Sequence, residues 1–268
     1  MLNTLEIFAN LILPLIAGLV FFGLARYVRY IAPMRLLVAG KLTYRGAFWG
    51  FIFFGIYLAT RPLQILLGPH PLPLIINNIR EFFMIGLFGP AVFLAMLNFV
   101  YGEGKLKKPL IIFVCGLGLI LATLFVVFNI FAIGGSKEIF RVGSYAVYDG
   151  LWFDNPNLST RALMRILFVI RLLDPVILLL IAGIIVFWRG VTYPCDSIYT
   201  NMPRKYFFMA GAVFAFAFSM LFAGFMFLIW KIPNQWWIYY VGALLAGFLE
   251  AISLSLPLSH GVKITDHQ

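Results

Sequence analysis

Residues 109–133 read PLIIFVCGLGLILATLFVVFNIFAI, a run of 25 residues that contains no charged side chain. About 20 consecutive apolar residues, wound as an α-helix, are enough to cross the hydrocarbon core of a lipid bilayer. A helix that is apolar on every side has no face to offer to water. This run therefore predicts a transmembrane helix, with the lipid bilayer as its surroundings.

Similar runs recur through the rest of the chain, which is 63% hydrophobic and only 11% charged. Soluble domains are roughly 45–50% apolar and about 25% charged, so a water-soluble fold is not expected. We expect an all-α, polytopic membrane protein in which residues 1–268 form one bundle of about seven transmembrane helices. The expected spans are 6–28, 46–68, 76–101, 109–133, 162–188, 206–230 and 236–257.

Basic residues mark the ends of the apolar runs, and their distribution predicts an orientation. Twelve lie in the first, third and fifth connections and the C-terminal tail: Arg26, Arg29, Arg35, Lys41, Arg45, Lys105, Lys107, Lys108, Arg189, Arg204, Lys205 and Lys263. Only four lie on the other side: Lys137, Arg141, Arg161 and Lys231. Because cytoplasmic loops carry the excess of Lys and Arg, the N-terminus is expected outside and the C-terminus in the cytoplasm.

The net charge of +10 does not indicate a nucleic-acid partner, because the basic residues are not gathered on one polar segment. Their placement favours contact with anionic lipid headgroups instead. We expect a multi-pass protein of the cell (inner) membrane. The longest connection, residues 134–161, lies on the outer side, and its GSYAVYDGLWF stretch is expected to form a short hairpin or a lid over the bundle.

Polar residues inside the apolar runs are the candidate functional residues, since such residues are costly in a membrane and face the protein interior or water. A group in the outer half of the second, third and fifth spans could bind a small anionic ligand: Arg61, Asn77, Arg80, Glu81, Arg171 and Asp174. Its surplus of positive charge favours a carboxylate or phosphate. The alternative is a set of closed ion pairs between helices.

Glu250 lies apart from this group, in the inner half of the last span. It is a possible ion or proton site, or else a polar contact to a neighbouring helix. Small residues recur every fourth position in the sixth span, at Gly211, Ala215, Ser219 and Ala223. Such a ridge lets helices approach closely, either within the bundle or between two copies of the chain.

Three prolines interrupt spans, at Pro14, Pro90 and Pro175. Broken helices at membrane depth often border a cavity, so these prolines add support for a pocket.

Several function classes are not expected. No histidine lies inside a predicted span, which argues against haem and intramembrane metal ligation. No catalytic triad or nucleophile motif is present either, so we expect no cofactor, no metal and no enzymatic activity.

Three functions are compatible with this pattern. A seven-helix receptor or sensor with an outward polar pocket, signalling through a protein partner, matches the expected topology. A transporter or channel for a small anion would use the same arginines to line a path. An accessory subunit of a larger complex, binding a lipid or a quinone, would fit the short loops. The topology resembles that of seven-helix receptors only in outline, so the choice stays open.

Overall fold

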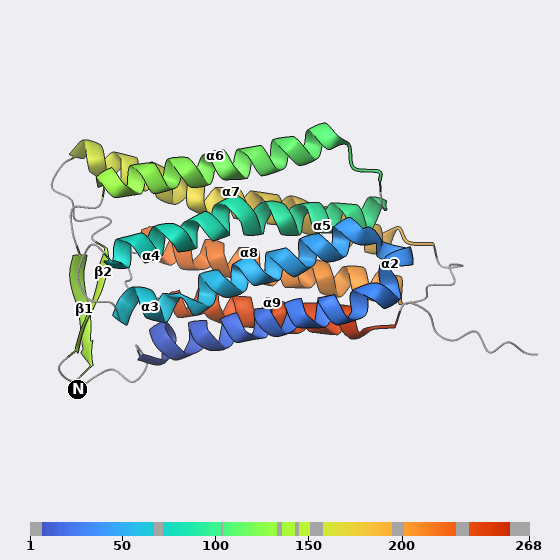
Figure 1. The fold of residues 1–268 in the computed structure, drawn as a ribbon, viewed down its shortest axis with the longest axis horizontal. Helices are drawn as coiled ribbons and strands as arrows, with labels where there is room; N and C mark the ends of the chain where they lie inside the picture. The colour runs from blue at the N-terminus through green and yellow to red at the C-terminus, as the bar shows by residue number, and fades with distance from the viewer. Residues whose placement is uncertain are drawn as a thin grey trace, which may run out of the picture.

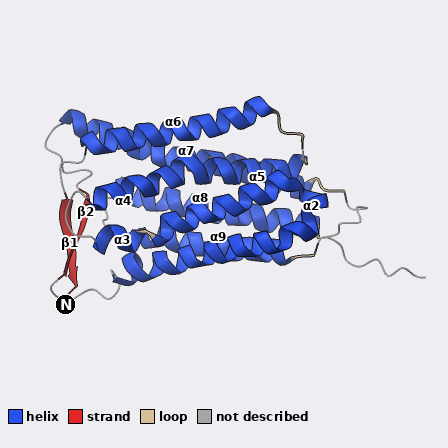
Figure 2. Ribbon diagram, in the orientation of Figure 1, coloured by secondary structure: helices blue, strands red, loops and turns tan. Residues whose placement is uncertain are grey.

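The computed structural model describes residues 7–66, 72–102, 104–132, 136–142, 145–150, 158–194, 201–228 and 236–257. Helices run side by side along one axis, and a single small hairpin lies across one end of the bundle (Figures 1 and 2). In chain order the elements are η1 (Phe8–Ile12), α2 (Leu13–Ala59), α3 (Arg61–Leu66), α4 (Leu72–Glu81), η2 (Phe82–Phe88), α5 (Gly89–Tyr101), α6 (Lys108–Ala132), β1 (Ser136–Val142), β2 (Tyr145–Gly150), α7 (Leu158–Val191), α8 (Met202–Leu228) and α9 (Trp236–Ser255).

Five helical segments among the described residues are long and apolar enough to cross a membrane. They are Phe8–Tyr30, Ile75–Tyr101, Lys108–Phe128, Met202–Met226 and Trp237–Ser255. Each coincides closely with an expected span, which confirms the helical class and indicates a membrane protein. The two other expected spans, 46–68 and 162–188, correspond to the second half of α2 with α3 and to α7, whose described apolar part is Pro175–Val191.

The connection between the first two expected spans is helical rather than a loop, because α2 runs without a break from Leu13 to Ala59. The helix travels to one end of the bundle and returns beside itself (Figure 1). A Cβ placed on Gly18 would lie 2.8 Å from the Cβ of Ala59, so the two arms touch there. The residues in the bend include Leu, Met, Ala and Arg, which are good helix formers.

Two of the three prolines lie two residues after the end of a wide π-helical turn. Pro14 comes after η1, and Pro90 comes after η2 and lies at the start of α5. Proline has no backbone N–H to bond to the carbonyl four residues earlier, so the preceding turn adjusts. Pro175 lies inside α7 and packs near Gly89, where a Cβ would be 3.7 Å from it. The bundle is therefore irregular where α5 and α7 meet.

The small-residue ridge of the sixth span packs inside the bundle, against α9. A Cβ on Gly242 would overlap the Ser219 hydroxyl and lie 3.2 Å from the Ala215 carbonyl oxygen. Ala223 is buried as well. The interpretation of this ridge as internal packing is thus confirmed for α8 and α9, whose backbones approach closely because these positions carry almost no side chain.

A hairpin of two antiparallel strands forms in the connection 134–161, with Lys137 opposite Asp149 and Val142 opposite Tyr145. Of the GSYAVYDGLWF stretch expected to form it, only Tyr145–Gly150 is a strand, and its partner β1 precedes that stretch. Strand β2 lies against α3 and α4. We call this end of the bundle the hairpin end. The opposite end, where α5, α7 and α9 finish and α6 and α8 begin, we call the basic end (Figure 1).

Candidate functional site

A cavity of about 70 Å³ lies between helices in the middle of the bundle. Helices α2, α5, α7, α8 and α9 line it, together with the end of η2. The lining is apolar except for two side chains that carry oxygen, Thr43 and Glu250. The residues around it are Phe21, Thr43, Ala47, Phe51, Phe54, Phe88, Val92, Ala95, Met96, Leu179, Met209, Ala212, Val213, Phe216, Ala246 and Glu250.

Phenylalanine rings form most of the wall. Phe54 is almost fully buried, at 1% exposure, and is the centre of this group. Its ring stacks on Phe88 with centroids 4.4 Å apart and meets Phe21 edge-on at 4.6 Å. Phe216 completes the set at 4.9 Å. Edge-to-face and offset contacts at these distances are favourable, so the rings stabilise one another in the wall.

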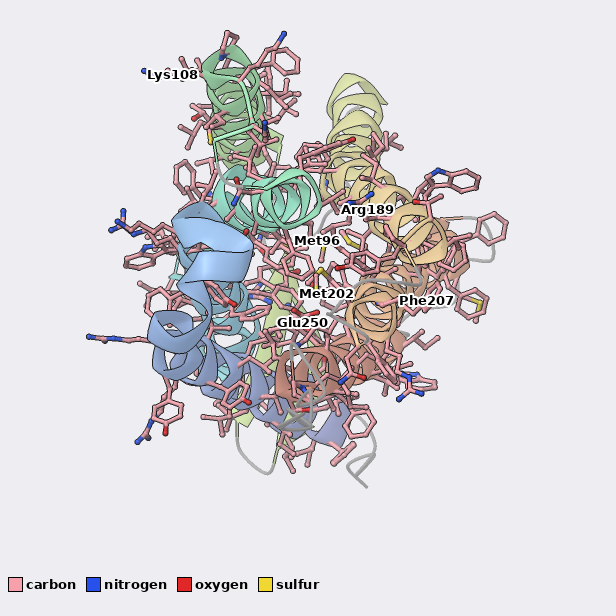
Figure 3. All side chains as sticks on the ribbon, turned by 90° about the vertical axis from the view of Figure 1, so that its right-hand side faces the viewer. Met96, Lys108, Arg189, Met202, Phe207 and Glu250 are labelled. Atoms are coloured by element: carbon pink, nitrogen blue, oxygen red, sulfur yellow. The ribbon has the colours of Figure 1, made fainter. Side chains whose placement is uncertain are left out.

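Glu250 reaches the cavity from α9, one turn beyond Ala246 toward the basic end. The residue is only 7% exposed. No side chain or backbone group of the described residues donates a hydrogen bond to its carboxylate. Figure 3, drawn from the basic end, shows Glu250, Met96 and Met202 gathered toward the middle of the bundle, whereas Lys108 and Phe207 lie on the outside.

Lys205 supplies a positive charge near this carboxylate. It lies at the start of α8, is 4% exposed, and interacts electrostatically with Glu250. Its Nζ donates to the carbonyl oxygen of Ser253 at 2.6 Å. In return, the Ser253 hydroxyl donates to the Lys205 carbonyl oxygen at 3.2 Å. A cation at the C-terminal carbonyls of a helix is favourable, so this pair joins the start of α8 to the end of α9.

Thr43 is the other polar group of the cavity, and it comes from α2. Its hydroxyl oxygen accepts a hydrogen bond from the Asn98 amide at 2.9 Å. Both residues are buried. In the part of the chain that the structure describes, no acceptor takes the proton of the Thr43 hydroxyl. The cavity therefore offers one hydrogen-bond donor from Thr43 and a carboxylate acceptor from Glu250.

The polar candidates Arg61, Asn77 and Arg80, here called the outer polar group after their expected position, lie at the hairpin end of the bundle. Arg61 Nη1 donates to Gln64 Oε1 at 3.1 Å, and Gln64 Nε2 donates to Asn77 Oδ1 at 3.2 Å. Arg80 donates to the Tyr57 carbonyl oxygen at 2.9 Å and also to Gln64 Oε1. The structure thus brings Arg61, Asn77 and Arg80 together through Gln64.

Arg80 is 2% exposed, and its guanidinium lies 4.6 Å from the centre of the Tyr57 ring. Glu81 is fully buried next to it in the chain. The amide nitrogen of Asn77 is buried and has no acceptor among the described residues. Arg171 and Asp174 belong to helix α7, but their side chains are outside the part of the chain that the structure describes. Their membership of this group therefore stays a prediction.

Buried aromatic rings lie between the outer polar group and the cavity. Tyr57, beneath Arg80, stacks on Phe54 with centroids 6.1 Å apart, and Tyr239 meets both rings edge-on, at 6.2 and 6.5 Å. All three side chains are buried. The two polar regions are therefore separate.

Sequence reasoning found Glu250 but missed Thr43, Asn98 and Lys205. A signal existed for Lys205, since it begins a series with Met209, Ala212 and Phe216 at helical spacing along one face of α8. The neighbouring Arg204 falls outside this series and is exposed. Within the described residues, no group of three His, Cys, Asp or Glu side chains lies close enough to hold a metal ion.

Comparison of the chain with protein-family models, with curated proteins and with solved structures finds no match.

Proposed function

We propose that this protein is a receptor- or sensor-type membrane module that binds a small, mostly apolar ligand in the central cavity. The observation that carries the proposal is Glu250, a buried carboxylate that faces the cavity and receives no hydrogen bond from the described residues. A buried polar group without a hydrogen-bond partner is costly, by about 1–3 kcal/mol and more when it is charged. A bound ligand would remove that cost.

The number of helices around the cavity favours a sensing function. A ligand there would contact α2, α5, α7, α8 and α9 at once, so its binding would act on the packing of the whole bundle. Differential contact of this kind is what shifts an equilibrium between two conformations. A protein partner would then read the change.

A transporter or channel is the less favoured function. It would need a polar path between the outer group and Glu250, and the rings of Phe54, Tyr57 and Tyr239 lie between them. An accessory subunit that binds a lipid or quinone would use the same cavity as a receptor. Stable co-purification with a fixed set of proteins would favour the subunit.

We also propose that the chain crosses the cell (inner) membrane seven times, with the hairpin end outside. The two arms of α2 and helix α7 would add to the five long apolar segments. The basic end carries exposed Arg26, Arg29, Lys105 and Lys107, as expected of the cytoplasmic side. Under this topology the hairpin is an outer lid.

A second candidate is a small anion bound by the outer polar group. Arg80 donates to two neutral acceptors, and the buried Asn77 amide nitrogen has no acceptor among the described residues. A carboxylate or phosphate could accept from both. Titration of acetate and of phosphate against wild-type and Asn77→Leu protein tests this, and equal heats from the two proteins would contradict it.

The central-cavity proposal is tested by filling the cavity. We expect wild-type protein, purified in mild detergent, to carry a small molecule detectable by native mass spectrometry. Ala212→Leu should lose it, because Ala212 lines the cavity. Phe218→Leu changes a lipid-facing position of the same helix and should keep it. The proposal would be contradicted if all three proteins carried the small molecule to the same extent, or if only the Phe218→Leu control lost it.

A further inference from the structure

We propose, resting on the function above, that the central cavity binds a neutral molecule through an alcohol group, with the hydroxyl toward Glu250 and Thr43 and the hydrocarbon part toward the phenylalanines. The two polar groups lie toward the basic end of the cavity. In α2, Thr43 precedes Ala47, Phe51 and Phe54, and in α9, Glu250 is the lining residue nearest the C-terminus. The cavity is thus polar at one end only.

Charge balance decides against an ionic ligand. Lys205 interacts electrostatically with Glu250, and both side chains are buried. A neutral ligand adds no charge to this pair. An organic cation would bring an unmatched positive charge into the membrane interior, and an anion would be repelled by the carboxylate itself.

A bare metal cation is also a poor occupant. Hard cations take about six or more oxygen ligands, and only Thr43 and Glu250 among the lining residues have side-chain oxygens. The remaining wall is hydrocarbon and thioether. Rings such as Phe54 and Phe216 suit the apolar part of an organic molecule.

Hydrogen-bond matching selects the alcohol among neutral ligands. Glu250 needs a donor, whereas the Thr43 hydroxyl has a proton to give, because its oxygen already accepts from Asn98. An alcohol donates and accepts through one oxygen atom and can serve both residues. A ketone or ether can only accept, and a hydrocarbon can do neither.

The volume of the cavity limits how much of a ligand can enter it. The cavity of about 70 Å³ is roughly half as large as one of about 150 Å³ that binds benzene. By this comparison about three heavy atoms fit, such as a hydroxyl with two carbons at the end of a longer molecule.

Three probes of the same shape separate the possible ligand chemistries: 3-fluoropropan-1-ol, 3-fluoropropan-1-amine (an ammonium ion at neutral pH) and 1-fluorobutane. Binding is measured by ¹⁹F NMR with the full-length protein in lipid nanodiscs. Ala212→Leu, with the cavity filled, corrects for partitioning into lipid, and Phe218→Leu is the matched control. We expect the alcohol to bind wild-type protein about ten-fold more tightly than either other probe.

Two substitutions test the assigned contacts. Thr43→Val keeps the shape and removes the hydroxyl, and Glu250→Gln keeps the shape and removes the charge. Each should weaken alcohol binding several-fold and leave 1-fluorobutane unchanged. If Glu250→Gln fails to fold, Thr43→Val still decides.

The outcomes separate the two proposals. Tightest binding of the amine, or equal binding of alcohol and fluorobutane, overturns the alcohol assignment but leaves the cavity as a ligand site. If wild-type protein and Ala212→Leu give identical spectra with all three probes, the cavity binds none of them and the proposed function fails with the inference.

Discussion

Two of the buried charged side chains among the described residues, Arg80 and Lys205, each donate to a backbone carbonyl of another helix. Arg80 uses the Tyr57 carbonyl, and Lys205 uses the Ser253 carbonyl. Both bonds connect residues far apart in the chain. The charged residues therefore tie helices together while they satisfy their own hydrogen-bonding needs.

Removal of Arg80 should loosen the hairpin end. In Arg80→Met the Gln64 and Tyr57 oxygens lose their buried donor, which costs about 2–4 kcal/mol of unfolding free energy. Unfolding in mixed detergent–SDS micelles measures this loss. Arg29→Met is the control, because Arg29 is exposed and should change stability by less than about 0.5 kcal/mol. Equal effects of the two changes would contradict the hydrogen-bond network.

Lys205 and Arg204 form a natural matched pair, because they are adjacent in the chain but only Lys205 is buried. Lys205→Met breaks the link to Ser253 and leaves Glu250 without its opposite charge, so we expect a loss of about 2–4 kcal/mol in the same unfolding assay. Arg204→Met should have little effect. Adding Glu250→Gln to Lys205→Met should recover part of the loss, since the two residues interact. Strict additivity would show that they do not.

Helices in this bundle have wide turns before prolines and approach one another closely at glycines. The wide turns η1 and η2 end two residues before Pro14 and Pro90. Gly118 lies against Pro90, where a Cβ would come within 2.6 Å of the ring. A proline on one helix is thus accommodated by a glycine on the next, and η2 ends at Phe88 in the cavity wall.

The contact between α8 and α9 should depend on a missing side chain. Gly242→Ala introduces a Cβ that would overlap Ser219, and we expect it to destabilise the protein by about 1–3 kcal/mol. Alanine is normally the better helix former by about 1 kcal/mol, so the loss would come from packing alone. In Gly23→Ala the new Cβ meets open space, and stability should stay equal or rise. A neutral Gly242→Ala would contradict the close approach.

The hairpin end and the basic end of the bundle are proposed to lie on opposite sides of the membrane. Cysteine labelling tests this orientation directly. In a background where Cys115 and Cys195 are replaced by serine, Lys137→Cys in β1 should react with a membrane-impermeant maleimide on intact cells. Lys105→Cys, between α5 and α6, should react only after permeabilisation. Only α6 separates these positions among the long apolar segments. Labelling of both from the same side would therefore contradict a membrane-spanning α6.

The membrane-helix class and the helix positions follow from the amino-acid sequence alone. Runs such as 109–133 are long and free of charge, and both properties belong to the chain itself. The same holds for the candidate polar residues, because Arg61, Asn77 and Arg80 stand out within apolar surroundings. Their contact with one another depends on the fold, through Gln64 and the packing of α3 against α4.

The cavity could not be predicted in this way. Thr43 and Asn98 meet across 55 positions of the chain, and Lys205 and Ser253 across 48. Hydropathy records only that such segments are apolar, and every helix of a membrane bundle shares that property. Which faces turn inward, and where packing leaves a space, depends on helix bends and on small residues that meet from different helices. The sequence by itself shows Glu250 as a charge in an apolar run. Only the packing of α9 with four other helices places that residue at one end of a cavity.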